Sequence, residues 1–160
     1  QITEAVDKYK STMERVGKAL SQYSADTLMD QLSYFELVVF CFLTGNNDMH
    51  LKNFSMIQAN GKWALSPAYD LLNVNLANPS DKEELALNME GKKRKFTRHN
   101  FERFGANLGL NSKQIQGVFS RFEKKKSQAL SLLNASFLTL EGRENYWSIM
   151  ELRYKAVLGD

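Results

Sequence analysis

Seven consecutive apolar residues, at positions 37–43, constrain the fold of this chain more than any other feature. They end a stretch, beginning at residue 26 or 27, that is mixed in polarity at first and then apolar nearly all round. A helix that is apolar on every face has to be buried, so the sequence predicts a central buried helix. Gly45 follows as a natural helix end. The run is much shorter than the about 20 residues that cross a bilayer, and we therefore expect no membrane segment.

Helical spacing recurs before and after this segment. Apolar residues three and four positions apart, Tyr9 among them, predict a helix over residues 4–20. Further helices are expected over 100–108, from Asn111 to about residue 137, and over 144–157. Asn111 and Gln114 have the spacing of a capping box, which marks a helix start. Because the sequence has no internal repeat and no long linker, we expect residues 1–160 to form a single domain.

Two short hairpins are expected between the helices. Asn60-Gly61 separates the runs 54–59 and 62–66, and this dipeptide is the strongest short-range signal for a hairpin with a type I′ turn. Residues 85–89 and 94–96 flank residues 91–93 and are typical of a second small hairpin. Residues 70–80 are expected to be irregular. The predicted fold class is therefore mainly α, with a minor β component (α+β).

Composition excludes several classes of protein. The chain is 43% hydrophobic with 2 prolines and 9 glycines, which is typical of an ordered domain and not of a disordered or collagen-like chain. Its one cysteine, Cys41, lies in the apolar run, so we expect a buried reduced thiol and a cytoplasmic protein. Gln1 is not followed by a charged segment and an apolar segment, which speaks against a signal peptide. We expect the chain to be a fragment of a longer protein.

One polar loop carries the candidate chemistry. Residues 46–53 follow the buried helix and precede the first hairpin, and within them Asp48 and Asn53 have the spacing D-x-x-x-x-N. In protein kinases, an aspartate and an asparagine at this spacing act as the base for the substrate hydroxyl and as a magnesium ligand. The spacing alone is a weak signal, because Asp70 and Asn75 repeat it.

The predicted hairpin brings a second carboxylate to this loop. With Asn60-Gly61 as turn residues, pairing back along the strands places Asn53 opposite Ala68. Asp70 is two residues further on, about 7 Å along the strand. We therefore expect that one Mg²⁺ can bridge the Asn53 amide oxygen and the Asp70 carboxylate, while Asp48 faces the incoming hydroxyl.

The same residues carry a resemblance to a known family. Residues 45–55, GNNDMHLKNFS, and residues 66–72, SPAYDLL, resemble the C-terminal lobe of HipA-like serine/threonine-protein kinases, the toxins of bacterial toxin–antitoxin modules. The resemblance extends through residues 85–96 and 101–110, whereas the last 50 residues match only in helical character. It implies a protein-kinase-like C-terminal helical lobe that contains a catalytic hairpin.

The resemblance also implies roles for individual residues. Asp48 is the expected proton acceptor, and Asn53 and Asp70 are the expected Mg²⁺ ligands. Together with these two, the residues expected to line the phosphates of ATP are His50, Lys52 and Tyr69. Members of the family phosphorylate protein hydroxyls, with aminoacyl-tRNA synthetases as targets, and are held by a DNA-binding antitoxin. We expect the same substrate class and partner in the bacterial cytoplasm.

One departure limits what this chain is expected to do alone. The 47 residues before Asp48 contain no glycine-rich phosphate loop and no strand bearing an ATP-pairing lysine. The sequence therefore predicts that the N-terminal ATP-binding lobe is supplied elsewhere, in cis or in trans, and that the isolated chain is inactive.

Plainer interpretations stay open for several residues. His50 is alternatively a structural hydrogen-bonding residue, Lys52 a solvated charge, and Tyr69 a packing residue that fixes the Asp70 loop. Basic clusters at 92–95 with Arg98, and at 124–126 with Arg121, can meet nucleic-acid phosphates or simply be solvated.

Two other functions are compatible with the sequence. A small-molecule phosphotransferase, of the aminoglycoside or choline kinase type, uses the same D-x-x-x-x-N spacing and a later aspartate. A non-catalytic module that docks an antitoxin or another protein is the alternative from a different class.

Overall fold

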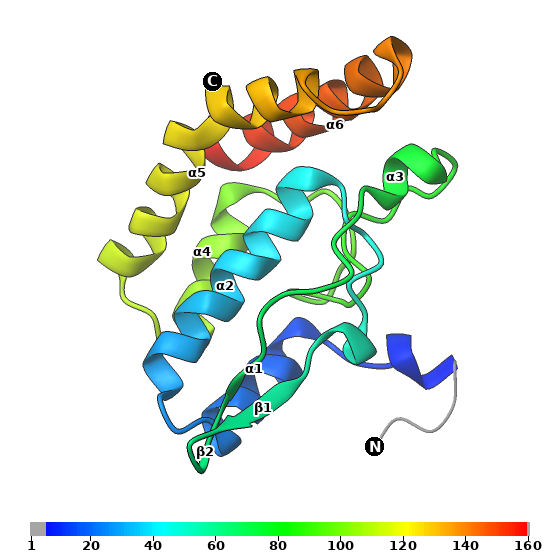
Figure 1. The fold of residues 1–160 in the computed structure, drawn as a ribbon. Helices are drawn as coiled ribbons and strands as arrows, with labels where there is room; N and C mark the ends of the chain where they lie inside the picture. Colours follow the sequence, from blue (N-terminus) through cyan, green and yellow to red (C-terminus); the bar gives the residue numbers. More distant parts are fainter. Residues whose placement is uncertain (1–5, 160) are drawn as a thin grey trace.

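The computed structural model describes residues 6–159, which form a helical body with one small hairpin (Figure 1). The elements, in chain order, are η1 (Val6–Tyr9), α1 (Met13–Tyr23), α2 (Thr27–Thr44), η2 (Leu51–Asn53), β1 (Met56–Ala59), β2 (Lys62–Leu65), α3 (Val74–Ala77), α4 (Arg98–Asn107), α5 (Ser112–Asn134) and α6 (Leu140–Leu158), where η denotes a 3-10 helix. The expected mainly α fold with a hairpin is confirmed.

The central helix is α2, as the apolar run predicts. The Asp26 side chain caps its start by accepting from the Met29 amide at 3.2 Å, and Gly45 ends it in the left-handed conformation with φ 75°. Its buried side chains, among them Phe35 and Phe42, join a core that also receives side chains from α1, α4, α5 and α6. In Figure 1, α2 runs through the middle, with α5 and α6 at one end and α1 with the hairpin at the other.

By length and composition, α2 could cross a membrane, which the seven-residue run alone did not suggest. All 18 of its residues fall in the apolar window, and 44% of that window is buried inside the protein. The core helix of a globular protein meets the same criteria, so this is weak support for a membrane span.

The predicted hairpin is confirmed together with its register. β1 and β2 pair antiparallel, with Ala59 opposite Lys62 and Met56 opposite Leu65. Asn60 and Gly61 have φ values of 51° and 75°, the positive values that a type I′ turn requires. The pairing continues beyond the strands through a hydrogen bond from the Ser66 amide to the Ser55 carbonyl oxygen, 2.9 Å long.

The first helix and the predicted loop at 70–80 differ from expectation. α1 begins at Met13 instead of residue 4, because the Thr12 side chain accepts from the Arg15 amide and caps a new helix after η1. Residues 4 and 5 of that prediction lie outside the described residues. The loop contains the short helix α3, which the Asn73 side chain caps by accepting from the Leu76 amide at 2.8 Å.

The second hairpin forms only as a tight turn. Met89 and Lys92 make an isolated antiparallel bridge, and Glu90 and Gly91 between them have φ values of 52° and 76°. No regular strands flank this turn within the described residues. Successive side chains at 85–87 are all buried, so this segment lacks the alternation of a strand and packs into the core instead.

The boundaries of the last two helices also differ from expectation. α5 starts at the predicted capping box of Asn111 and Gln114 but ends at Asn134 instead of residue 137. α6 begins at Leu140, four residues early, because the Thr139 side chain accepts from the Gly142 amide at 3.1 Å.

Candidate active site

The polar loop after α2 is held by its own backbone. The Asn46 amide donates to the Cys41 carbonyl oxygen at 2.9 Å, which continues the helix end. The Asn46 side chain then accepts from the Asp48 amide at 3.2 Å. Two further turns follow, from the His50 amide to the Asp48 carbonyl oxygen and from the Asn53 amide to the His50 carbonyl oxygen, at 2.8 and 2.9 Å. Asp48, His50 and Asn53 are therefore carried by a compact, repeatedly hydrogen-bonded segment.

A side chain also anchors this loop to the segment before the turn at 89–92. Asn47 is buried, and its amide nitrogen lies 2.9 Å from Asp81 Oδ2 and 3.1 Å from the Glu83 carbonyl oxygen. The sequence does not predict this anchor. Asp81 and Glu83 are 34 and 36 positions from Asn47, and no local pattern links residues so far apart.

Asn53 and Asp70 meet, as the hairpin register predicts. Asn53 Nδ2 donates to Asp70 Oδ2 at 3.0 Å and to the Asp48 carbonyl oxygen at 3.2 Å. Asn53 is buried, and Asp70 is exposed with φ 56°, a left-handed conformation that aspartate tolerates better than most residues. One amide group therefore ties the backbone of the polar loop to the carboxylate beyond the hairpin.

The Asp48 carboxylate is contacted from an unexpected direction. The hydroxyl of Tyr9, at the end of η1, donates to Asp48 Oδ1 at 2.5 Å. Burial, and then the hydrogen bond to Asp48, raise the pKa of Tyr9 above its ordinary value. The helical spacing placed Tyr9 on the apolar face of a helix over 4–20, and two residues that are 39 positions apart carry no local signal for this contact.

His50 lies beside this pair. Its side chain is 6% exposed, and its Nδ1 atom is buried without a hydrogen-bond partner among the described residues. The Tyr9 ring packs against its ring edge-on, with 5.4 Å between centroids. A purely structural histidine would be expected to satisfy this nitrogen, so packing alone does not explain the unpartnered atom.

Lys52 and Tyr69 lie on the exposed side of the loop. The Lys52 side chain is exposed. The backbone carbonyl oxygen of Lys52 accepts from the Tyr69 hydroxyl at 2.9 Å. That hydroxyl also lies 3.2 Å from Ser55 Oγ. Tyr69 thus fastens the segment leading to Asp70 onto the start of the hairpin, as the packing interpretation expects, and its role at ATP stays a prediction.

The arrangement offers oxygen atoms that suit Mg²⁺. Within the described residues there is no group of three or more His, Cys, Asp or Glu side chains that could hold a metal. Mg²⁺, however, is commonly held by one or two protein oxygens, with substrate phosphates and water completing its shell. Because the Asn53–Asp70 hydrogen bond uses Asn53 Nδ2 and Asp70 Oδ2, it leaves Asn53 Oδ1 and Asp70 Oδ1 for such a shell.

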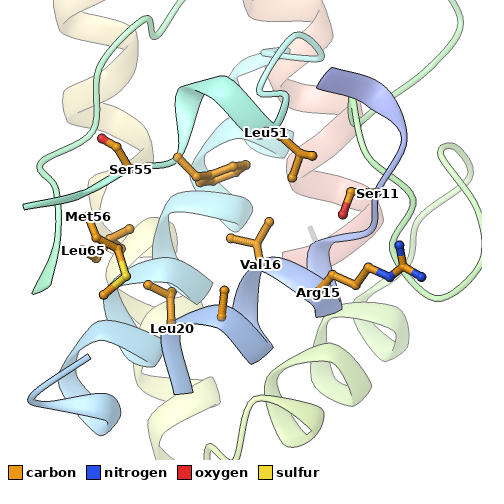
Figure 2. A pocket seen from close by; sticks show the side chains of 10 residues that line it. Ser11, Arg15, Val16, Leu20, Leu51, Ser55, Met56 and Leu65 are labelled. Atoms are coloured by element: carbon orange, nitrogen blue, oxygen red, sulfur yellow. The ribbon is translucent and has the colours of Figure 1, made fainter. Parts of the chain in front are cut away.

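A cavity lies next to the loop but is not lined by the predicted site residues. It has a volume of about 230 Å³ and lies between α1 and residues 51–56, where Val16, Leu20 and Leu51 line it and Arg15 stands at its rim (Figure 2). None of the six predicted site residues lines it.

A comparison with known families accounts for this combination of fold and loop. The model of a family described as the HipA-like C-terminal domain matches residues 1–130. The chain belongs to this family. All six predicted site residues lie inside the matched part of the HipA-like C-terminal domain, whereas α6 lies beyond it.

Individual proteins resemble the chain as well. A Haemophilus influenzae protein named "Putative kinase" is 28% identical over 142 residues, which is 78% of this chain and 41% of that protein. A Sinorhizobium fredii protein named "Putative kinase Y4dM" is 41% identical over 64 residues, 39% of this chain and 15% of that protein.

The fold is also similar to that of a solved structure. The match is to a chain in the Shewanella oneidensis complex of HipA, HipB and operator DNA, with a TM-score of 0.77 at 21% identity. It covers 92% of this chain and 36% of that chain. The HipA-like C-terminal domain described here thus spans well under half the length of these relatives.

Proposed function

We propose that the intact protein is a Mg-ATP-dependent serine/threonine-protein kinase, the toxin of a bacterial toxin–antitoxin module, and that this chain is its C-terminal catalytic lobe. The observation that carries the proposal is the 3.0 Å contact between Asn53, on the same loop as Asp48, and Asp70, beyond the hairpin. The names of the two bacterial relatives support the kinase activity. The neighbour solved with HipB and DNA supports an antitoxin partner.

In this proposal, Asp48 accepts the proton of a serine or threonine hydroxyl. The hydroxyl oxygen forms a bond to the γ-phosphorus as the bond from that phosphorus to the ADP oxygen breaks. Asn53 and Asp70 would hold Mg²⁺, which when bound neutralises charge on the phosphates. His50, and Lys52 with its exposed side chain, would orient the phosphates.

The proposed partners follow from the family. The protein substrate is expected among bacterial aminoacyl-tRNA synthetases, and the antitoxin is a DNA-binding protein. An N-terminal ATP-binding lobe, in cis or in trans, completes the nucleotide site. The proposed compartment is the bacterial cytoplasm, and this chain alone is expected to be inactive.

A transfer assay tests the proposal. The full-length protein that contains this chain is incubated with Mg²⁺, γ-labelled ATP and a panel of purified bacterial aminoacyl-tRNA synthetases. We expect label on a serine or threonine, and a loss of about 10²–10⁴-fold in rate for Asp48→Asn, because a positioned base contributes that much. Asp70→Asn should also lose activity, whereas Glu123→Gln, which removes a charge from an exposed face of α5, should not.

The same assay separates the alternatives. Label on an aminoglycoside or on choline, and not on protein, would favour a small-molecule phosphotransferase. A full-length protein that binds its antitoxin but transfers no phosphate would favour the docking module and contradict the proposal.

A further inference from the structure

The Asp48 backbone and the Asp48 carboxylate are held by different parts of the protein. The backbone amide is bound by the Asn46 side chain, and the carbonyl oxygen accepts from the His50 amide and from Asn53 Nδ2. None of these bonds fixes the side-chain torsions. Within residues 6–159, the hydrogen bond from Tyr9 is the contact that holds the carboxylate itself.

Tyr9 is in turn fixed from several sides. Its ring packs edge-on against His50 at 5.4 Å, with an interplanar angle of 83°. The Lys8 ammonium group lies 4.8 Å from the ring centroid and that of Lys93 lies 6.0 Å from it. Lys93 is also paired with Glu83 at 2.9 Å, on the segment that anchors the loop. The hydroxyl therefore reaches Asp48 from a ring whose position is set by its surroundings.

We propose that Tyr9 is a positioning residue for phosphoryl transfer, which holds Asp48 Oδ1 so that Oδ2 faces the hydroxyl of the phosphoacceptor. The inference rests on the proposed function and adds to it a residue from outside the catalytic loop. A hydrogen bond from a hydroxyl to a carboxylate is short and about twice as strong as one between neutral groups. It is therefore strong enough to select one rotamer of a half-buried side chain whose carboxylate makes no other hydrogen bond within residues 6–159.

The charges that face the phenol allow it to stay a donor. Burial and the Asp48 carboxylate raise the pKa of Tyr9, whereas the Lys8 ammonium group lowers it to a smaller extent. Among the described residues, His50 and the Lys93–Glu83 pair are the other ionisable groups against the ring. The hydroxyl therefore keeps its proton at neutral pH and can donate it to the hydrogen bond.

A Tyr9 hydroxyl that blocked the phosphoacceptor would have the opposite effect on the kinetics. If the Tyr9 hydroxyl stood where the substrate hydroxyl has to bind, it would compete with the phosphoacceptor. Removing it would then raise the rate or lower KM for the acceptor, whereas removing a positioning contact lowers kcat.

Kinetics of the full-length protein distinguish these roles. Tyr9→Phe removes the hydroxyl and keeps the ring against His50, and Tyr23→Phe is the matched control on the exposed end of α1. With ATP and the acceptor found in the synthetase panel, we expect Tyr9→Phe to lower kcat about tenfold. KM for ATP should change less than about twofold, because the contact acts on the base and not on the nucleotide. Tyr23→Phe should behave as wild type.

An unchanged or increased kcat in Tyr9→Phe overturns the proposal. If both tyrosine variants lose the same activity, the loss does not come from the Asp48 contact, and the proposal is overturned as well. Thermal melting of each variant is measured alongside, since a fall in kcat without a fall in melting temperature is not what a merely structural residue gives.

A second measurement does not depend on activity. In protein labelled with ¹³C at the tyrosine ring carbon that bears the hydroxyl, the Tyr9 signal is assigned by its loss in Tyr9→Phe. Asp48→Asn should bring the pKa of Tyr9 down toward its ordinary value, because the carboxylate raises it. No change in this titration overturns the contact. If wild-type protein transfers no phosphate at all, the proposed function fails and the role of Tyr9 in transfer fails with it, while the titration still reports whether the contact exists.

Discussion

Asn53 donates hydrogen bonds to two neighbours from one side-chain amide group, and these bonds join the two segments of the candidate site. Its nitrogen reaches both Asp70 Oδ2 and the Asp48 carbonyl oxygen, at 3.0 and 3.2 Å. The amide oxygen takes no part in these two bonds, and in the proposed function it faces the metal ion. An asparagine is suited to this position because it offers a donor to the carboxylate and an acceptor to a cation at once.

Replacing Asn53 by aspartate tests this dual use. In Asn53→Asp, two carboxylates face each other where a donor and an acceptor now stand 3.0 Å apart. We expect the free energy of unfolding to fall by about 1–3 kcal/mol, because the bond is lost and like charges approach. Millimolar Mg²⁺ should recover part of this loss by binding between the carboxylates.

Thermal melting with and without Mg²⁺ measures both effects. The control is Asn107→Asp on α4, where the asparagine donates to Glu90 Oε1 in an exposed contact outside the loop. If the Asn53→Asp and Asn107→Asp variants are equally destabilised and respond equally to Mg²⁺, the assignment of Asn53 as a metal ligand is contradicted.

At the residue scale, the sequence predicted contacts that follow from local pairing and missed those that need tertiary packing. The approach of Asp70 to Asn53 could be counted from the turn at Asn60-Gly61, because hairpin register is set locally. The Tyr9 contact depends on η1 lying beside η2, which no spacing in the sequence encodes. The roles of Asp48, His50, Lys52 and Tyr69 in transfer stay predictions.

At the element scale, the end of α2 decides where the loop begins. Gly45 has φ 75°, and a Cβ atom there would lie 2.9 Å from Asn73 Oδ1, which caps α3. The Gly45 carbonyl oxygen accepts from the Asn75 amide at 3.4 Å. The turn from α2 into the loop is therefore packed directly against the start of α3.

Two glycine substitutions separate the conformational cost from the packing cost. Gly61 has the same φ of 75° in the hairpin turn, but a Cβ atom there would meet nothing within 4 Å. We expect Gly61→Ala to lower the free energy of unfolding by about 1–2 kcal/mol, the cost of a left-handed alanine. Gly45→Ala should cost more, because Asn73 also has to move.

Chemical denaturation of the two variants gives the comparison. Equal losses of stability would contradict a close approach of α2 to Asn73. A loss at Gly45 that exceeds the one at Gly61, accompanied by reduced transfer in the full-length protein, would show that this packing supports the loop.

The elements themselves were predictable to the extent that they carry a regular pattern. α2, α4, α5 and α6 follow helical spacing, and each overlaps the range that the spacing predicts, although α6 begins at Leu140, earlier than expected. α3 has only four residues, too few to carry a period. The prediction of a second pair of strands was wrong. The consecutive side chains at 85–87 are all buried in the core, and only the bridge between Met89 and Lys92 pairs as in a hairpin.

At the scale of the whole molecule, the helix that leads into the site loop is packed into an aromatic core. The Phe42 ring lies 5.0 Å from that of Phe101 and 6.0 Å from that of Phe96, and the Arg153 guanidinium group of α6 lies 4.7 Å from its centroid. α6 lies beyond the part of the chain that the family model matches, yet it packs on α2. The last helix therefore belongs to the core of this chain.

A pair of phenylalanines tests this account of the core. Phe42 is fully buried, whereas Phe137, between α5 and α6, is fully exposed. Phe42→Ala should lower the free energy of unfolding by about 3–5 kcal/mol, because it leaves a large cavity. Phe137→Ala should change it by less than about 0.5 kcal/mol. Similar denaturation midpoints for the two variants would contradict the described core.

The most direct test of the central claim is a calorimetric titration of full-length protein with ATP, in the presence and absence of Mg²⁺. In the proposed function, Asp48 accepts the proton and Asp70 holds the metal. Wild-type protein and Asp48→Asn should therefore bind ATP with similar affinity in Mg²⁺, and Asp70→Asn should lose the part of the affinity that Mg²⁺ adds. An Asp70→Asn protein that binds Mg-ATP as tightly as wild type would contradict the proposed site.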